Sequence, residues 1–400
     1  MKYRKVIADM TLNIVSSAIP TFVLQLLILP DIANYMTDNQ YGLFVTILAL
    51  LNVVSSTFGN ALNNVRLISN EKLQGKVTSY NCVLLLLSVL NFFIVAVFYI
   101  FYESEYSLIN LALTIIVSLV WLWHEYFIVA FRLVIDYKKI LLSNIILVIG
   151  YFIGYFFYRI SGYWQFIYLI GHTASLMFIF ANCSLWKEGL RKDSNFYYLT
   201  RETGLLSGSN VLSRVTTYAD KLLIFPILGG TSVSVYYAAT LFGKVVSLAI
   251  TPISSVMLTY LAKLNKKNDN LFIMTTVSGS VVCVFGYIFC LLITKPVLSL
   301  LYPRFVDAAM PYITITTATM VLTSLISLIN PFVLNFFSMK WQIIINSIYV
   351  AVYISLSMSM LHVWGLYGFC IGSLIATLCK LLSIFYIYFK TNTKLEKLKS

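Results

Sequence analysis

The sequence predicts an all-α integral membrane protein with about twelve transmembrane helices in two six-helix bundles. Of its 400 residues, 60% are hydrophobic and 11% are charged, whereas soluble domains have about 45–50% apolar and about 25% charged residues. The apolar residues fall in continuous runs of about twenty, the length at which a helix crosses about 30 Å of hydrocarbon. Barrel strands alternate over about ten residues instead. The expected spans are 12–33, 41–62, 77–102, 106–131, 140–160, 163–186, 203–228, 233–262, 271–294, 309–337, 341–361 and 365–389.

The distribution of Lys and Arg predicts the orientation of these spans. Of the 28 basic residues, 21 fall at the two termini and in alternate loops, and only Arg159, Lys295 and Arg304 fall in the opposite loops. Cytoplasmic loops are the ones rich in Lys and Arg, so we expect both termini in the cytoplasm. A missed span would invert every later loop, so the asymmetry also supports the span count.

Composition and motifs disfavour several function classes. The net charge of +13 does not indicate a nucleic-acid partner, because the basic residues are spread over short loops. The six cysteines lie in or beside apolar runs without a CxxC pair, and the three histidines lie in separate spans, so no metal site is expected. No GxxxxGK[ST] motif occurs, so no ATP cofactor is expected. The loops are too short for a catalytic domain, so we do not expect an enzyme.

A short internal repeat predicts the domain organisation. Residues 26–30 recur as residues 222–226, at an offset of 196. This match pairs the first span with the seventh and predicts an N-terminal six-helix bundle at 1–186, a cytoplasmic linker at 187–202 and a C-terminal six-helix bundle at 203–400. Because six is even, both halves insert with the same orientation, which gives a parallel pseudo-two-fold repeat.

The repeat also predicts two hinges. At the same offset Tyr41 aligns with Tyr237, and Pro30 aligns with Pro226 near the end of each first helix. Proline removes an internal hydrogen bond and kinks a helix. Pro30 and Pro226 are therefore candidate hinges, with ordinary transmembrane proline as the alternative.

The seventh span carries the densest polar cluster, which includes Asn210, Ser213, Arg214, Asp220 and Lys221. An ionisable side chain at the centre of a bilayer costs at least about 2.5–3.5 kcal/mol, so this face should line a water-filled cavity or a helix contact. Arg214 and Lys221 are seven residues apart and share a face. Asp220 lies about 100° round the helix from Lys221, so we expect it to pair only partially with either cation, or with another helix.

Two further cations extend the predicted substrate site. Lys244 lies in the eighth span and Lys380 in the twelfth. With Arg214 and Lys221 they outnumber Asp220, and a cavity with surplus positive charge suits an anionic substrate, for which a pyrophosphate is the obvious candidate. Snorkelling of Lys244 or Arg214 to an interface is the alternative.

Two acidic residues are candidates for H⁺ or Na⁺ coupling. Glu125 lies in the fourth span, where a buried carboxyl group can carry a proton or a cation; a paired structural carboxylate is the alternative. Asp31 follows Pro30 and is expected at the outer interface. His124 is expected to be a hydrogen-bonded packing residue.

Several motifs resemble one membrane family over the whole chain. They are Asn13-x-x-Ser16-Ser17, Pro30, Tyr41-Gly42-Leu43-Phe44, Tyr218-Ala219-Asp220-Lys221-Leu222-Leu223-Ile224 and Tyr236-Tyr237-Ala238-Ala239. With the length and the twelve spans, they resemble the Wzx-type O-antigen flippases of the multidrug/oligosaccharidyl-lipid/polysaccharide (MOP) exporter superfamily, whose fold is MATE-like.

The resemblance implies a V-shaped pair of bundles in the bacterial inner membrane. Such proteins move undecaprenyl-pyrophosphate-linked oligosaccharide repeat units to the periplasmic leaflet by alternating access, for O-antigen, lipopolysaccharide or capsule biosynthesis. Arg214 and Lys221 would attract the pyrophosphate or acidic sugars. The implied partners are the lipid-linked oligosaccharide, the lipid bilayer, and the polysaccharide polymerase and chain-length machinery.

Four alternatives stay open. A cation-coupled drug or small-molecule exporter of the same superfamily would need acidic residues in its spans, and the cation surplus disfavours it. A major-facilitator transporter has the same number of spans, but its usual Gly-Asp-Arg signature is missing from 63–76. A membrane-embedded transferase would turn over a labelled donor, and a non-transporting scaffold would tolerate substitutions in the cavity.

Overall fold

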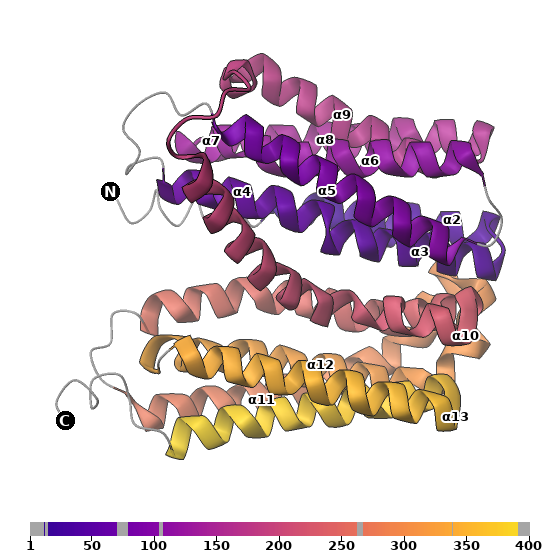
Figure 1. The fold of residues 1–400 in the computed structure, drawn as a ribbon. Helices are drawn as coiled ribbons and strands as arrows, with labels where there is room; N and C mark the ends of the chain where they lie inside the picture. Colours follow the sequence, from indigo (N-terminus) through magenta and orange to yellow (C-terminus); the bar gives the residue numbers. More distant parts are fainter. Residues whose placement is uncertain are drawn as a thin grey trace. The chain divides into compact units, whose positions relative to one another are not determined.

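The structure is a computed structural model that describes residue 12 and residues 15–69, 79–103, 107–261, 267–337 and 339–390. These residues form helices and contain no strand (Figure 1). The elements after the start of the first span are η1 (Leu24–Ile28), α2 (Leu29–Tyr35), α3 (Asp38–Val53), α4 (Ser55–Ser69), α5 (Ser79–Tyr102), α6 (Leu108–Phe127), α7 (Val129–Leu133), α8 (Tyr137–Ser161), α9 (Gln165–Asn182), η2 (Leu185–Lys187), α10 (Phe196–Leu261), α11 (Asp269–Leu301), η3 (Pro303–Phe305), α12 (Val306–Phe336) and α13 (Met339–Lys390).

Within the described ranges, ten helices are long and apolar enough to cross a membrane. Two of the ten contain a backbone break: α10 at Gly229 (φ 72°, ψ 177°) and α13 at Trp364 and Gly365 (φ 59° at the glycine). Such positive φ values with extended ψ are essentially restricted to glycine. Counting the pieces on either side of each break separately accounts for the twelve predicted spans. The predicted fold class, an all-α integral membrane protein, is confirmed.

Both repeat prolines lie beside a distortion of their helix. Immediately before Pro30, residues Leu24–Ile28 form a π-turn in which the N–H of Leu29 donates to the carbonyl of Leu24. Proline cannot donate a helical hydrogen bond and crowds the preceding turn, and a π-turn relieves that crowding. Pro226 lies three residues before the break at Gly229. Their role as hinges stays a prediction.

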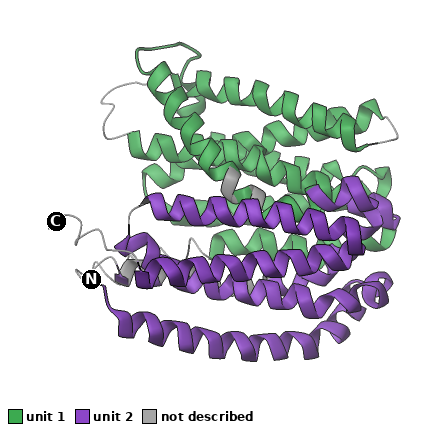
Figure 2. Ribbon diagram, turned by 60° about the horizontal axis from the view of Figure 1, so that its bottom comes forward, with its two compact units in different colours: residues 1–35, 43–222 green, residues 36–42, 223–400 purple. Residues whose placement is uncertain are grey.

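The contacts divide the chain into two compact units (Figure 2). Unit 1 contains residues 1–35 and 43–222, and unit 2 contains residues 36–42 and 223–400. Residues 203–222, which the repeat assigns to the C-terminal bundle, therefore pack with the N-terminal helices. The chain crosses between the units three times: once between α2 and α3, once within α3 and once within α10.

In unit 1 the helices approach closely where small residues face each other. A side chain on Gly150 would place its Cβ 2.6 Å from the Cα of Gly171, so α8 and α9 touch backbone to backbone there. Their contact brings the hydroxyls of Ser143 and Ser175 to 2.7 Å. Such small-residue interfaces with interhelical hydrogen bonds are the usual way in which helices associate in lipid.

In unit 2 the core is aromatic. Phe272 of α11 stacks on Tyr388 of α13 with 3.7 Å between ring centroids, and Phe332 of α12 meets Phe272 edge to face at 5.2 Å. A second group joins residues 36–42 to this unit, with Arg304 donating to the carboxylate of Asp38 at 2.7 Å.

Residues at equal positions of the repeat are neighbours in this second group. The hydroxyl of Ser234 donates to the carbonyl of Asp38 at 2.6 Å, an offset of 196 residues. At the same offset, the rings of Tyr41 and Tyr237 lie 6.0 Å apart. The repeat itself and the two six-helix bundles that it predicts stay predictions.

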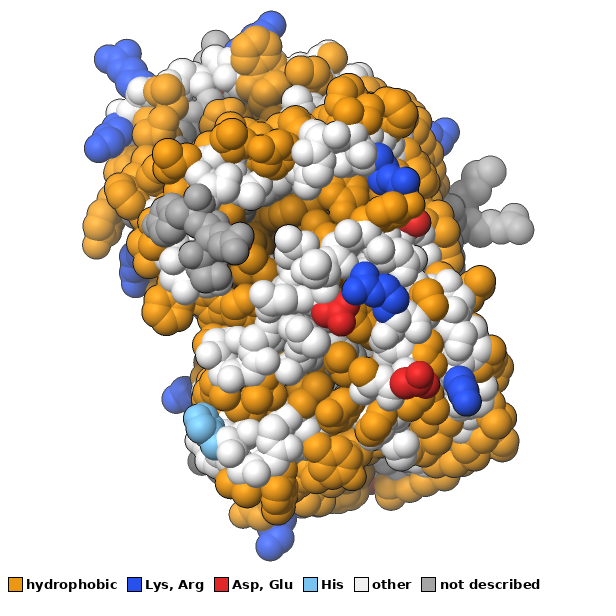
Figure 3. All heavy atoms as spheres, turned by 90° about the vertical axis from the view of Figure 1, so that its right-hand side faces the viewer, with side chains coloured by type: hydrophobic (Ala, Val, Ile, Leu, Met, Phe, Trp, Pro, Cys, Tyr) orange, Lys and Arg blue, Asp and Glu red, His pale blue; other side chains and the backbone are white. Residues whose placement is uncertain are grey.

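The surface of the described chain suits a bilayer. Large apolar side chains such as Phe101, Phe285, Leu292 and Val363 are about three-quarters exposed. The face drawn in Figure 3 is mostly hydrophobic or uncharged, with few charged side chains.

Candidate substrate-binding site

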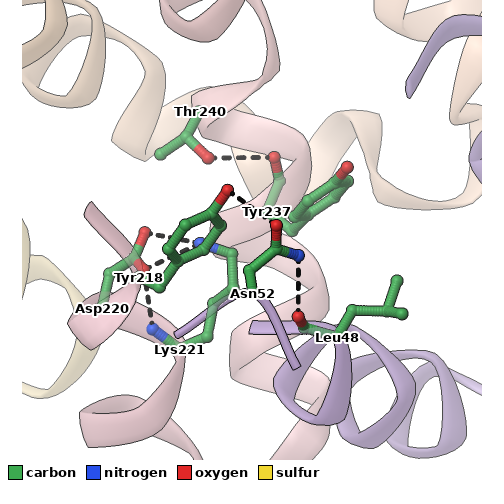
Figure 4. Close-up of polar contacts among 7 residues, drawn as sticks. All are labelled: Leu48, Asn52, Tyr218, Asp220, Lys221, Tyr237 and Thr240. Atoms are coloured by element: carbon green, nitrogen blue, oxygen red, sulfur yellow. Dashed lines mark hydrogen bonds and ion pairs between the residues drawn. The ribbon is translucent and has the colours of Figure 1, made fainter. Parts of the chain in front are cut away.

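The first half of α10 holds a buried ion pair between neighbouring residues. The Nζ of Lys221 lies 2.7 Å from Oδ1 and 2.8 Å from Oδ2 of Asp220, and both side chains are more than nine-tenths buried (Figure 4). The expectation that Asp220 pairs only partially with Lys221 is therefore wrong. The 100° angle separates the Cβ atoms, but the long lysine stem swings its ammonium group back to the neighbouring carboxylate.

Tyr218 connects this pair to the rest of unit 1. Its hydroxyl donates to Oδ1 of Asn52 at 3.3 Å, and Nδ2 of Asn52 donates to the carbonyl of Leu48 at 2.9 Å (Figure 4). The ammonium group of Lys221 lies 5.9 Å from the centre of the Tyr218 ring. The Tyr218 hydroxyl also forms a hydrogen bond with Arg214, one turn earlier on α10. Arg214 is half-buried.

Glu125 of α6 is the carboxylate that faces this arginine. Its charge interacts with Arg214 and with Arg132. Its Oε2 accepts from Asn60 at 3.0 Å, and its Oε1 accepts from the indole of Trp121 at 3.3 Å. Both oxygens are thus engaged, as in a paired structural carboxylate. Its predicted role in ion coupling stays a prediction.

Carboxylates accompany the cations of this site. Asp220 pairs with Lys221, and the charge of Glu125 interacts with both Arg214 and Arg132. The predicted surplus of cations in the cavity stays a prediction. Guanidinium groups bind phosphate oxygens with two parallel hydrogen bonds, so Arg214 is suited to an anionic group. Among the residues that the structure describes, no three His, Cys, Asp or Glu side chains are placed to hold a metal ion.

The remaining predicted substrate residues lie on α10 or in unit 2. Lys380 belongs to unit 2, where its Nζ lies 4.5 Å from the centre of the Tyr349 ring. Asn210 is half-buried on α10. The side chains of Ser213 and Lys244 lie outside the described residues.

Asp31 is held in a polar group in the first turn of α2. Arg159 of α8 lies 3.6 Å from its Oδ2, the Tyr155 hydroxyl donates to the same oxygen, and the Arg159 guanidinium stacks on Tyr35 at 3.6 Å. This arrangement ties the first helix to α8. A role of Asp31 in ion coupling stays a prediction.

Sequence reasoning missed two partners of α10. The first is Asn52, a lone amide in an apolar run, which could have been singled out as a polar residue in a span. The second is Tyr102 of α5, whose hydroxyl donates to the carbonyl of Leu222 at 2.9 Å. Leu222 lies four residues before Pro226, so the proline leaves that carbonyl without its helical donor. Tyr102 supplies the missing hydrogen bond.

Comparisons with known proteins concern the fold. No family model and no curated protein matches the sequence. The lipid II flippase MurJ in an inward closed conformation aligns with a TM-score of 0.74 at 15% identity, over 98% of this chain and 88% of its own.

Two MATE transporters also align. An inward-facing multidrug resistance MATE transporter of the MOP superfamily gives a TM-score of 0.60 at 11% identity, over 94% of this chain and 97% of its own. The MATE transporter VcmN of Vibrio cholerae, in the bent form, gives a TM-score of 0.54 at 11% identity, over 96% of this chain and 98% of its own. The chain therefore has the fold that the lipid II flippase MurJ shares with the MATE transporters.

Proposed function

We propose that this protein is a flippase that moves an undecaprenyl-pyrophosphate-linked oligosaccharide repeat unit from the cytoplasmic to the periplasmic leaflet of a bacterial inner membrane. The observation that carries the proposal is the half-exposed Arg214 beside the Asp220–Lys221 pair, on a fold shared with a lipid II flippase. A pyrophosphate matches a guanidinium. The polar side chains of α10 offer hydrogen bonds to sugars.

The Asp220–Lys221 pair suggests how the site binds an anion without being strongly charged when empty. In the described structure the Lys221 ammonium is satisfied by Asp220. A phosphate held by Arg214 would compete with Asp220 for the same ammonium. The repeat unit would then enter surface polysaccharide assembly, with the polymerase and chain-length machinery as downstream partners.

The test is leaflet-specific accumulation of lipid-linked sugar in cells with and without the protein. We expect intermediates to accumulate on the cytoplasmic leaflet without it and with Arg214→Ala, with at least a tenfold loss of flipping. Arg214→Lys should retain only part of the flipping activity, since lysine keeps the positive charge but lacks the planar guanidinium group that binds a phosphate with two hydrogen bonds. Lys340→Ala, which removes an exposed cation of α13, is the matched control. If the leaflet distribution of lipid-linked sugar is unchanged in the deletion strain, the proposed substrate is wrong.

A cation-coupled exporter is the second candidate, because Glu125 is a carboxylate inside a span with oxygens arranged by Asn60 and Trp121. Its prediction differs from that of the flippase. Removal of Glu125 would abolish resistance to a cationic dye, whereas Arg214→Ala would leave it intact.

A further inference from the structure

Two buried histidines meet at the contact of α6, α8 and α9 in unit 1. The rings of His124 on α6 and His172 on α9 lie 5.0 Å apart at 69°, with 6% and 2% of their surfaces exposed. Trp121 stacks on His172 at 4.8 Å. The site described above uses neither histidine.

The hydrogen bonds of Ser175 favour one tautomer of His124. The Ser175 hydroxyl donates to the backbone carbonyl of Ser143 at 3.0 Å, and its oxygen also lies 2.7 Å from the Ser143 hydroxyl and 2.9 Å from Nε2 of His124. With its one hydrogen on the carbonyl, Ser175 accepts from Nε2, which then carries the ring hydrogen. A neutral imidazole has one donor and one acceptor nitrogen. The Nδ1 atom of His124 is then an unprotonated base.

This base has no partner in the described structure. Nδ1 of His124 is buried without a hydrogen bond, and so is Nδ1 of His172. His172 is contacted at Nε2 by the Tyr151 hydroxyl at 3.4 Å. Buried polar atoms are nearly always satisfied, so two unsatisfied nitrogens in facing rings point to a small ligand or a second state.

The side chains packed against the pair are aromatic rings and hydroxyl groups, with Glu125 as the carboxylate connected to them. From α6, Trp121 presents its ring and also donates from Nε1 to Glu125, the charged residue that connects to the pair. From α8 come Ser143 and Tyr151, and from α9 come Tyr168 and Ser175; all are neutral. Aromatic faces stabilise cations. Glu125 itself interacts with Arg132 and Arg214.

We propose that His124 and His172 form a proton-binding site in unit 1, with Nδ1 of His124 as the atom that takes the proton. In the described state both rings are neutral and closely packed. An imidazolium in dry surroundings is unfavourable, so protonation should favour a state in which α9 loosens from α6 and α8 and water enters. The site would thereby couple a proton gradient to the conformational change. This coupling, unlike proton binding itself, rests on the proposed function.

The first test measures proton binding directly. The chain has three histidines, His124, His172 and His362, so ¹⁵N-histidine labelling of the full protein in nanodiscs gives three imidazoles, and single variants assign them. We expect His124 as the Nε2–H form at neutral pH. On acidification it should gain a proton at Nδ1, with His172 shifting in the same transition. If His124 stays neutral over the whole pH range in which the protein remains folded, or already carries a proton at Nδ1 at neutral pH, the proposal is wrong.

A conservative variant separates proton binding from packing. His124→Gln retains an N–H donor for Ser175 but has no basic nitrogen, so the fold should persist while the shared transition of His172 disappears. His362→Gln is the matched control, since that ring is exposed and forms a hydrogen bond with the Met358 carbonyl of its own helix. A His172 signal that titrates unchanged in His124→Gln would contradict a shared site.

The second test asks whether the proton drives transport. The probe is a fluorescent undecaprenyl-pyrophosphate-linked monosaccharide in proteoliposomes. An imposed pH gradient of one unit should speed wild-type flipping several-fold, and this gain should vanish in His124→Gln while flipping without a gradient persists. Flipping that is insensitive to the gradient would refute the coupling and leave the proposed function standing. If the wild type does not flip the probe, the proposed function fails, and the NMR titration still decides the proton site.

Discussion

At the scale of single residues, the Asp220–Lys221 pair is a buried ion pair whose two charges compensate each other. A charge buried without a partner is strongly unfavourable, whereas a well-packed neutral replacement of both partners is often tolerated. The pair is more than nine-tenths buried, so replacing one partner should destabilise the protein more than replacing both. Comparing single with double substitutions tests the contribution of the pair to stability.

We expect Asp220→Asn to destabilise unit 1 by about 3–5 kcal/mol, because it leaves the Lys221 ammonium buried without its carboxylate. The double variant Asp220→Asn with Lys221→Met should recover most of that loss. Thermal unfolding in nanodiscs measures both. A single variant as stable as the wild type would show that Lys221 reaches another acceptor.

At the scale of helices, proline and tyrosine act together on α10. Pro226 has no backbone N–H that could donate to the Leu222 carbonyl, and the hydroxyl of Tyr102 of α5 donates to it instead. We expect Tyr102→Phe to cost about 1 kcal/mol of stability, since the ring and its stacking on Phe98 are retained. In a Pro226→Ala background, where the helix again donates to Leu222, the same change should be nearly neutral. Equal losses in both backgrounds would contradict this account.

The segment before α10 is fastened to unit 1. Arg66 of α4 donates to Tyr126 at 2.6 Å and to Glu188 at 2.5 Å, while Asn81 donates to the carbonyl of Glu188. At the far end the backbone N–H of Asp193 donates to the Ser79 hydroxyl at 2.9 Å. These bonds explain why residues 203–222 pack with unit 1 rather than with the C-terminal half.

Cys183, between α9 and η2, reports on that segment. Burial raises the pKa of its thiol above the ordinary value, and Glu188 adds to the effect. The thiolate is the reactive form, so alkylation at neutral pH should be slow and should rise with pH. Glu188→Gln removes the carboxylate and releases the segment, so in a background where Cys183 is the sole cysteine we expect several-fold faster maleimide labelling. Glu202→Gln is the control and should label like its parent.

At the scale of the whole molecule, orientation follows from the uneven distribution of basic residues. Reporter fusions after residue 390 and after residue 192 should both report a cytoplasmic location, and an insertion beside Arg304 should report the opposite side. The physical reason is that short loops rich in Lys and Arg are retained in the cytoplasm. A C-terminal fusion on the same side as Arg304 would require an odd number of spans.

The sequence by itself determined the fold class, the positions of the spans and the polar character of α10. Each follows from local properties: runs of apolar residues long enough to cross a bilayer, glycines that permit a break at 229 and 365, and prolines that distort the preceding turn. These features depend on neighbours a few residues apart, so a sequence records them directly.

Only the tertiary structure decided how the polar groups pair. The partners of Tyr218, Leu222 and Arg66 lie more than a hundred residues away in sequence, at Asn52, Tyr102 and Glu188. The side chain of Lys221 turns towards its neighbour Asp220 and forms a buried ion pair with it. The two histidines, which sequence reasoning treated separately, meet where α6 packs against α9. Contacts of this kind depend on how helices pack, and helical periodicity alone does not specify that packing.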